Sequence, residues 1–277
     1  MSKVPAITLN NGIAMPQLGF GVWQIPDDEA FTAVGQALET GYRSIDTAAI
    51  YGNEEGTGKA LAASGIPREE LFVTTKLWNS DQGYDSTLRA FDASLGKLGL
   101  EYVDLYLIHW PLPSRDNYVA TYRALEKIQA EGRAKAIGVS NFQPAHLERL
   151  LAETSVVPAV NQIELHPQFQ QAESRAFHAR HGIATEAWSP LGQGKGLLED
   201  PTIGRLAAKY GKTAAQVVLR WHLQLGNVVI PKSVTPSRIA ENIDVFGFEL
   251  DAEDLAALAG LDAGKRLGPD PATFDVV

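Results

Sequence analysis

The stretch GYRSIDTAAIYGNEE, residues 41–55, places a carboxylate and a phenol at the end of a short apolar strand. Asp46 lies near the carboxyl end of that predicted strand, and Tyr51 lies on the loop that follows it. Two later predicted strands also end in reactive side chains, the first in Lys76 and the second in His109. A fold that gathers the ends of its strands would bring these four side chains together.

Strand and helix signals alternate along the chain. Apolar, strand-like runs lie at Leu18–Trp23, Ser44–Ala48, Phe72–Trp78, Val103–His109, Ala134–Ser140, Ala159–Leu165, Ile183–Ser189 and Asn227–Ser233. Each is followed by a stretch with helical periodicity, and eight such units in 277 residues predict a (β/α)8 TIM barrel. A doubly wound sheet is the alternative, although no Gly-x-Gly-x-x-Gly motif opens a helix after the first strand. The barrel places the carboxyl ends of all strands at one face.

The two ends of the chain differ from this alternating pattern. Thr8–Pro16 predicts an N-terminal β-hairpin, with Asn11 and Gly12 as a two-residue type I′ turn. The segment after Leu267 contains Gly, Pro and Asp without periodicity, so we expect it to be irregular. No linker or low-complexity segment interrupts the chain, and residues 1–277 are therefore predicted to form a single domain.

The composition restricts the class of protein. A formal net charge of -9 argues against a partner that is a nucleic acid or an anionic membrane, because such binding needs a basic face. The chain has no cysteine, which excludes disulfides, thiolate catalysis and cysteine-bound zinc. It also lacks the apolar core of a signal peptide, and no stretch approaches the roughly 20 apolar residues that span a bilayer. We therefore predict a cytoplasmic enzyme.

The four strand-end side chains suit the reduction of a carbonyl group, which needs a hydride on carbon and a proton on oxygen. An ammonium about 4 Å from a phenol favours the phenolate by roughly 4 kcal/mol at an effective dielectric near 20, so Lys76 could lower the pKa of Tyr51. Asp46 is the natural counter-ion of a buried Lys76, and His109 offers a neutral N–H to orient the substrate oxygen. Each side chain also has an ordinary interpretation as a helix cap, a packed aromatic, a solvated strand end or a core histidine. The hypothesis therefore depends on the combination.

Several longer motifs resemble the aldo-keto reductases. They are GYRSIDTAAIYGNEE (41–55), TKLW (75–78), LGLEYVDLYLIHWP (98–111), GVSNF (138–142), NQIELHP (161–167) and IPKS (230–233). The resemblance spans nearly the whole chain, and YGNEEG (51–56) with PLGQGK (190–195) is similar to the bacterial 2,5-diketo-D-gluconate reductase branch. It implies the NADPH-dependent reduction of aldehydes or ketones to alcohols, with Tyr51 as proton donor tuned by Lys76 and Asp46.

The resemblance also implies that NADPH is bound without a Rossmann fold. Trp188 corresponds to the aromatic that stacks on the nicotinamide ring, where many relatives carry tyrosine. Lys232 and Arg238 correspond to the site of the 2′-phosphate, and two cations beside a helix N-terminus suit a dianion, although a solvated basic cluster is the alternative. The other implied cofactor contacts are Ser140, Asn141 and Gln162 for the carboxamide, Ser189, Leu191, Gln193 and Gly194 for the pyrophosphate, Ile230, Ser233 and Val234 beside the 2′-phosphate, and Glu241 and Asn242 for the adenine.

The substrate is predicted to be a small carbonyl compound. Trp23, Trp78 and Trp110 follow predicted strands and should line the mouth with Tyr51 and His109, although barrel core is their ordinary interpretation. The candidates are α-dicarbonyls, keto-sugar acids and aromatic aldehydes, acted on by a monomer. A redox sensor or regulatory subunit with little turnover is a second hypothesis. A metal-dependent barrel hydrolase is a third, although no clustered metal ligands occur in the sequence.

Overall fold

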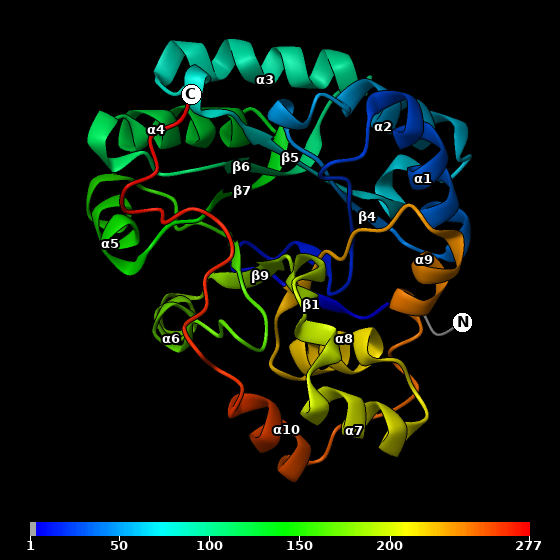
Figure 1. The fold of residues 1–277 in the computed structure, drawn as a ribbon. Coiled ribbons are helices and arrows are strands. Elements are labelled where there is room, and N and C mark those ends of the chain that lie inside the picture. The colour runs from blue at the N-terminus through cyan, green and yellow to red at the C-terminus, as the bar shows by residue number, and fades with distance from the viewer. Residues whose placement is uncertain (1–3) are drawn as a thin grey trace.

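The computed structural model describes residues 4–277 as a ring of parallel strands surrounded by helices (Figure 1). The chain begins with a hairpin of β1 (Ala6–Thr8) and β2 (Ala14–Pro16), and strands and helices then alternate. The later elements are β3 (Phe20–Gly21), α1 (Asp27–Thr40), β4 (Ser44–Asp46), α2 (Glu54–Ala63), β5 (Phe72–Leu77), α3 (Tyr84–Leu98), β6 (Val103–Ile108), α4 (Tyr118–Ala130), β7 (Ala134–Ser140), α5 (Pro144–Glu153), β8 (Val160–Glu164), α6 (Ala172–His181), β9 (Ala184–Trp188), α7 (Pro201–Tyr210), α8 (Ala214–Gln224), β10 (Val228–Val229), α9 (Pro236–Ile243) and α10 (Ala252–Ala259).

The strands form an 8-stranded parallel sheet in the order β10-β9-β8-β7-β6-β5-β4-β3. A parallel bridge between Leu18 and Val229 joins the two edges. On the same seam, the Gly19 N–H donates to Val229 O at 2.8 Å and the Gly21 N–H donates to Pro231 O at 3.2 Å. The ring is therefore closed, and the prediction of a (β/α)8 barrel is confirmed. The strands at the seam are shorter than predicted because only a few residues of each are in register there.

The hairpin is confirmed, but the two-residue type I′ turn predicted for it is wrong. That turn needs a positive φ at both of its central residues, and only Gly12 has one, at +85°. The Gly12 N–H instead donates to Leu9 O at 2.9 Å, and the Leu9 N–H donates to Ile13 O at 2.8 Å. The loop is therefore one residue longer than predicted and starts at Asn10. Asn10 can then donate its side-chain amide to Pro158 O at 3.1 Å, which ties the hairpin to the barrel.

The hairpin covers the amino-terminal end of the barrel, opposite the ends that carry the reactive side chains. Met15 of β2 is fully buried in a cluster with Leu105, Leu107 and Val160. Two larger apolar clusters fill the space between the strands and the helices. The helices around the ring pack closely, because a Cβ on Gly58 of α2 would lie 2.2 Å from Leu98 O of α3. The hairpin therefore closes the amino-terminal end of the barrel, and the carboxyl-terminal end carries the predicted reactive side chains.

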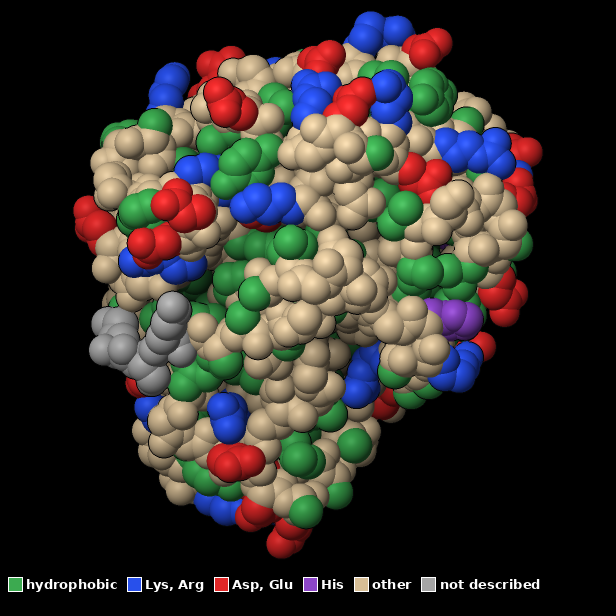
Figure 2. Space-filling model, turned by 180° about the vertical axis from the view of Figure 1, so that it is seen from behind, with side chains coloured by type: hydrophobic (Ala, Val, Ile, Leu, Met, Phe, Trp, Pro, Cys, Tyr) green, Lys and Arg blue, Asp and Glu red, His purple; other side chains and the backbone are tan. Residues whose placement is uncertain are grey.

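Charged side chains of both signs are scattered over the visible surface of the molecule (Figure 2). On the face seen in Figure 2, lysine and arginine side chains are interspersed with aspartate and glutamate, without an extended patch of one sign. Within residues 4–277, no helix is both long and apolar enough to cross a membrane. The C-terminal segment after α10 is irregular, as predicted, and runs past α6 and α5 towards α4 (Figure 1).

Candidate active site

The four side chains predicted to act together come from the same end of the barrel. Asp46 is the last residue of β4, Lys76 is next to last in β5, and His109 directly follows β6. These strands are neighbours in the sheet. Tyr51 ends a short 3-10 turn, Ala49–Tyr51, which follows β4. The strand ends therefore bring together residues that are up to 63 positions apart in the sequence, from Asp46 to His109.

Lys76 is fully buried and holds this group together. Its Nζ donates to Asp46 Oδ1 at 2.6 Å and to the Thr47 carbonyl at 2.9 Å. The Tyr51 hydroxyl lies 3.5 Å from the same Nζ. A buried ammonium is unfavourable unless it is paired, and the Asp46 carboxylate supplies that pairing. The Lys76 charge is thereby fixed within reach of the phenol.

Tyr51 is positioned by the buried Asn53, for which the sequence predicted no role. The Asn53 side chain accepts from the Thr47 hydroxyl at 2.8 Å and donates to Val22 O at 2.9 Å and Ile25 O at 2.8 Å. These bonds tie the Tyr51 turn to the loops after β3 and β4. The phenol is therefore held by a polar network within the barrel mouth.

The environment sets the protonation of these groups. Burial raises the pKa of Tyr51, while the Lys76 charge opposes that rise and the Asp46 charge adds to it. The lowering expected from Lys76 is thus present, but it is outweighed. Burial disfavours the Lys76 ammonium, yet Asp46 and Tyr51 together leave the pKa of Lys76 raised. Burial and the nearby Lys76 charge hold the pKa of His109 well below its ordinary value. At neutral pH the phenol is protonated, the lysine is charged and the imidazole is neutral.

A further carboxyl group in the barrel interior was missed by the sequence analysis. Glu186 of β9 is 1% exposed, and its Oε2 accepts from Gln162 Nε2 at 2.9 Å. The same Nε2 donates to Asp46 Oδ2 at 2.8 Å, so one amide joins the two carboxyl groups. Burial, with the Asp46 charge, raises the pKa of Glu186 to about 8. A charged residue inside a predicted buried strand was the signal that could have identified it.

The residues predicted to hold the carboxamide lie together and are hydrogen-bonded to one another. The Asn141 side chain donates to His109 O at 3.0 Å and to Ser140 Oγ at 3.1 Å. Its Oδ1 accepts from Trp188 Nε1 at 2.8 Å. Ser140 Oγ donates to Gln162 O at 2.8 Å. Both N–H groups of the Gln162 amide bond to carboxyl groups, which leaves its Oε1 as an acceptor for a ligand amide.

The loop after β9, predicted for the pyrophosphate, has an unusual backbone. Ser189 and Gln193 have positive φ values of +50° and +54°, and Gly192 and Gly194 also lie in the left-handed region. The Gln193 side-chain amide donates to Ser189 Oγ at 2.8 Å. Leu191, between them, is half-buried. Such turns can direct backbone N–H groups outwards, which suits an anion.

The residues predicted for the adenosine half lie between β10 and the end of α9. Lys232 and Arg238 are exposed, and neither forms an ion pair with any residue that the structure describes. Ser233 is buried and accepts from the Thr235 N–H at 3.1 Å, while Ile230 is buried and Val234 is exposed. Both cations are therefore available to an anionic ligand.

The two residues predicted for the adenine have different surroundings. Glu241 Oε1 accepts from the Thr213 hydroxyl at the start of α8, at 2.8 Å. Asn242 is buried in α9. The Glu241 carboxylate is therefore already engaged by a neighbouring helix.

Two of the three predicted mouth tryptophans meet at His109. The Trp78 and His109 ring centroids are 5.3 Å apart, and those of Trp110 and His109 are 6.5 Å apart. Phe274, from the C-terminal segment, lies 4.4 Å from Trp110 and adds a ring that the sequence analysis missed. Trp23 is 44% exposed and has no aromatic partner among residues 4–277. The mouth beside His109 is therefore aromatic.

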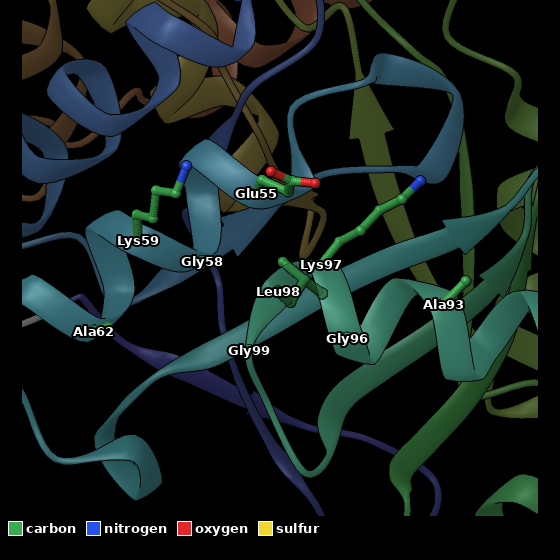
Figure 3. Close-up of a pocket in the computed structure, with 9 residues that line it drawn as sticks. All are labelled: Glu55, Gly58, Lys59, Ala62, Ala93, Gly96, Lys97, Leu98 and Gly99. Carbon is green, nitrogen blue, oxygen red and sulfur yellow. The ribbon is translucent and has the colours of Figure 1, made fainter.

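A cavity of about 500 Å³ lies away from this site, on the outer helical layer. Lys59 of α2 and Lys97 of α3 extend on either side of Glu55 around it (Figure 3). None of the predicted catalytic, cofactor or substrate residues lines this cavity. In the part of the chain that the structure describes, no group of three or more His, Cys, Asp or Glu side chains could hold a metal ion.

Comparisons with known proteins show what the whole chain is similar to. A model of the aldo/keto reductase family matches residues 15–263. The chain is 60% identical over 271 residues to an aldo-keto reductase of Mycolicibacterium smegmatis, covering 98% of both chains. It is 57% identical over 275 residues to methylglyoxal reductase DkgA of Escherichia coli, covering 99% of both. A crystal structure of a Gox0644 mutant in complex with NADPH has a TM-score of 0.95 and 53% identity, again covering 99% of both chains.

Proposed function

This chain belongs to the aldo/keto reductase family, and we propose that it is an NADPH-dependent carbonyl reductase that converts aldehydes or ketones to alcohols. One observation carries the proposal: the Tyr51 hydroxyl lies 3.5 Å from a fully buried Lys76, which Asp46 holds at 2.6 Å. A protonated phenol beside a fixed cation is a suitable proton donor, because the phenolate that it leaves is stabilised by that cation. Residues 1–277 act as one barrel domain in this proposal, and as a monomer.

The residues around Trp188 and Lys232 fit NADPH. Trp188 is half-buried, and its Nε1 bond to Asn141 fixes the orientation of a flat aromatic face suited to stacking. Gln162 Oε1 is an acceptor for the N–H groups of the carboxamide. At the other end, Lys232 and Arg238 form no ion pair with residues 4–277, so their charges are available for the 2′-phosphate. NADPH, when bound, supplies the hydride that reaches the carbonyl carbon.

The protein supplies the proton and the orientation. Tyr51 donates its hydroxyl proton to the carbonyl oxygen, which completes the alcohol, and the resulting phenolate faces Lys76. Neutral His109 donates one N–H to the same oxygen and fixes its direction. The phenol then regains its proton from solvent.

The substrate class in this proposal is a small carbonyl compound that fits an aromatic mouth. Trp78 and Trp110 lie beside His109, and Phe274 packs on Trp110. Methylglyoxal and other α-dicarbonyls are the first candidates, since a relative that is 57% identical carries the name methylglyoxal reductase. Keto-sugar acids and aromatic aldehydes are the next.

A substrate panel tests the proposal. The loss of NADPH absorbance is followed with methylglyoxal, a keto-sugar acid and an aromatic aldehyde, in the unmodified protein and in Tyr51→Phe. We expect the unmodified protein to reduce at least one of these carbonyl compounds, and Tyr51→Phe to reduce it much more slowly. Tight NADPH binding without turnover of any carbonyl would instead favour a redox sensor, and equal rates in Tyr51→Phe would remove Tyr51 from the mechanism.

A further inference from the structure

The C-terminal strap, residues 263–277, runs along one side of the barrel, past α6 and α5 towards α4 (Figure 1). It follows α10, and its far end is attached near α3 and α4. Asn79 donates its side-chain amide to Val276 O at 2.6 Å, and Arg115 Nε lies 2.5 Å from Asp275 Oδ1. Phe274 packs on Trp110. The end of the strap is therefore attached beside Trp110, one of the residues predicted to line the substrate mouth. The middle of the strap lies near Trp188, which is predicted to contact the cofactor.

A buried carboxylate at the end of β8 holds the middle of the strap. Glu164 is 1% exposed, its Oε1 accepts from the Leu267 N–H at 2.6 Å, and its Oε2 accepts from the Gly268 N–H at 2.8 Å. His166 Nε2 lies 3.0 Å from Oε1. Burial alone would raise the pKa of Glu164, but His166 and the two amides outweigh it and leave that pKa lowered. The strap thus supplies two of the three polar contacts of a buried negative charge.

The same stretch of strap lies against the predicted stacking residue. A Cβ on Gly268 would be 2.6 Å from Trp188 Cη2 and 3.1 Å from Glu164 Oε2, so only glycine allows this approach. Glu164 and Trp188 are directly paired across β8 and β9. The backbone of Gly268, which Glu164 holds, therefore packs against the edge of the Trp188 indole.

The far side of the indole is connected to the reaction site. Trp188 Nε1 donates to Asn141 Oδ1 at 2.8 Å, and the Asn141 amide donates to His109 O at 3.0 Å. Arg266 of the strap lines a small cavity together with Asn141. The hydrogen bond to Asn141 and the packing of Gly268 thus restrict the orientation of the Trp188 ring.

We propose that Glu164 is a positioning residue that fixes the C-terminal strap against Trp188 and so holds the indole in the orientation that receives the nicotinamide ring. The inference rests on the proposed function, because it takes Trp188 as the stacking surface. When the strap is released, the Gly268 backbone no longer packs against Trp188. The indole is then held by its hydrogen bond to Asn141 and can take other side-chain orientations. Cofactor binding becomes weaker because the ring must be ordered when the ligand arrives.

Two variants release the strap in different ways. Glu164→Gln keeps the size of the side chain but places an NH₂ group opposite a backbone N–H. Gly268→Ala leaves the carboxylate intact and forces the strap away from Trp188. The matched control is Gly247→Ala, since a Cβ there meets nothing within 4 Å. If one of the two variants does not fold, the other still tests the proposal.

The first measurement does not depend on the cofactor. Lys265 and Arg266 directly precede the held residues, so trypsin can cut there once the strap is free. Mass spectrometry of the native proteins should show faster loss of the C-terminal peptide in both variants than in the unmodified protein and in Gly247→Ala. Equal cleavage rates in all four would overturn the role of Glu164 in holding the strap.

The second measurement is the dissociation constant of NADPH. We expect both variants to bind NADPH about fivefold more weakly or worse, which corresponds to about 1 kcal/mol. In a Trp188→Phe background, Glu164→Gln should weaken binding little further, because both changes act through the indole. A freed strap with unchanged NADPH affinity, or an undiminished effect in Trp188→Phe, would sink the inference. Absence of NADPH binding in the unmodified protein would instead refute the proposed function.

Discussion

Lys76 and Lys232 carry the same ammonium group in two different surroundings. Lys76 is fully buried, with its charge paired to Asp46, whereas Lys232 is exposed and forms no ion pair with the described residues. A buried charge needs a partner within the fold, so its position and its effect on neighbours are fixed before any ligand arrives. An exposed charge can remain unpaired, but water and salt screen it. The first arrangement suits a permanent effect on one neighbouring group, and the second suits a ligand that comes and goes.

The largest effect is expected from removing the phenol beside the buried cation. Tyr51→Phe should lower kcat by roughly 10²–10⁴, because the proton donor is lost. The dissociation constant of NADPH should hardly change, since the phenol contributes to the reaction and not to the adenosine half of the site. Steady-state rates and NADPH titration measure the two quantities. Full activity in Tyr51→Phe would mean that the buried group has no part in proton transfer.

The buried lysine itself should matter nearly as much. Lys76→Met leaves Asp46 without its partner and Tyr51 without its cation, so kcat should fall almost as far as in Tyr51→Phe. The double variant should be little worse than either single variant, because residues that act as one unit are strongly non-additive. Rates of the two single variants and the double variant make this comparison. Losses that multiply would show that Lys76 works through a group other than Tyr51.

A smaller effect should come from the second buried carboxyl group. The unfolded chain releases the Glu186 proton near the ordinary pKa of about 4.3, whereas the folded chain holds it to about 8. The folded state binds more protons between these values, so its free energy of unfolding falls as the pH rises from about 4 to 8. Glu186→Gln removes this decline, which amounts to roughly 3 kcal/mol between pH 5.5 and pH 8.

Urea unfolding at pH 5.5 and pH 8 measures that difference. The exposed Glu69 side chain has no hydrogen bond or ion pair to another described residue, so Glu69→Gln is the control and should keep the decline of the unmodified protein. The groups that face Glu186 are Asp46, Lys76 and Tyr51, and they are the same in both variants. An identical pH dependence in Glu186→Gln would show that Glu186 is already charged at neutral pH.

The smallest effect belongs to the exposed lysine. Lys232→Met should raise the Michaelis constant for NADPH about tenfold, since one charge-assisted hydrogen bond is worth roughly 1.5–3 kcal/mol. The constant for NADH should stay almost the same because NADH lacks the 2′-phosphate. Added salt should raise the Michaelis constant for NADPH of the unmodified protein, because salt screens the attraction between Lys232 and the phosphate. Lys59→Met on α2 is the control and should leave the Michaelis constant for NADPH unchanged. Equal Michaelis constants for NADPH and NADH in the unmodified protein would show that Lys232 does not bind the 2′-phosphate.

The sequence predicted the barrel and the strand-end set because both depend on local patterns. The alternation of apolar runs with helical periodicity is set within each unit, and a parallel barrel places every strand end at the same face. Asp46, Lys76 and His109 could therefore be grouped without a structure. The N-terminal hairpin could be predicted for the same reason. Its turn was predicted wrongly because Gly12 takes its positive φ as the last residue of a three-residue loop, which is another hairpin connection compatible with a glycine at this place.

Only the tertiary structure decided how these groups affect one another. The pKa of Tyr51 depends on the balance between burial and the Lys76 charge, and neither can be read from spacing. The Gln162 amide joins Glu186 of β9 to Asp46 of β4, and these two strands are not neighbours in the ring. The contact of Glu164 with Gly268 joins residues more than a hundred positions apart. Periodicity determines which face a side chain takes, whereas distances between strands far apart in sequence are set by register and close packing.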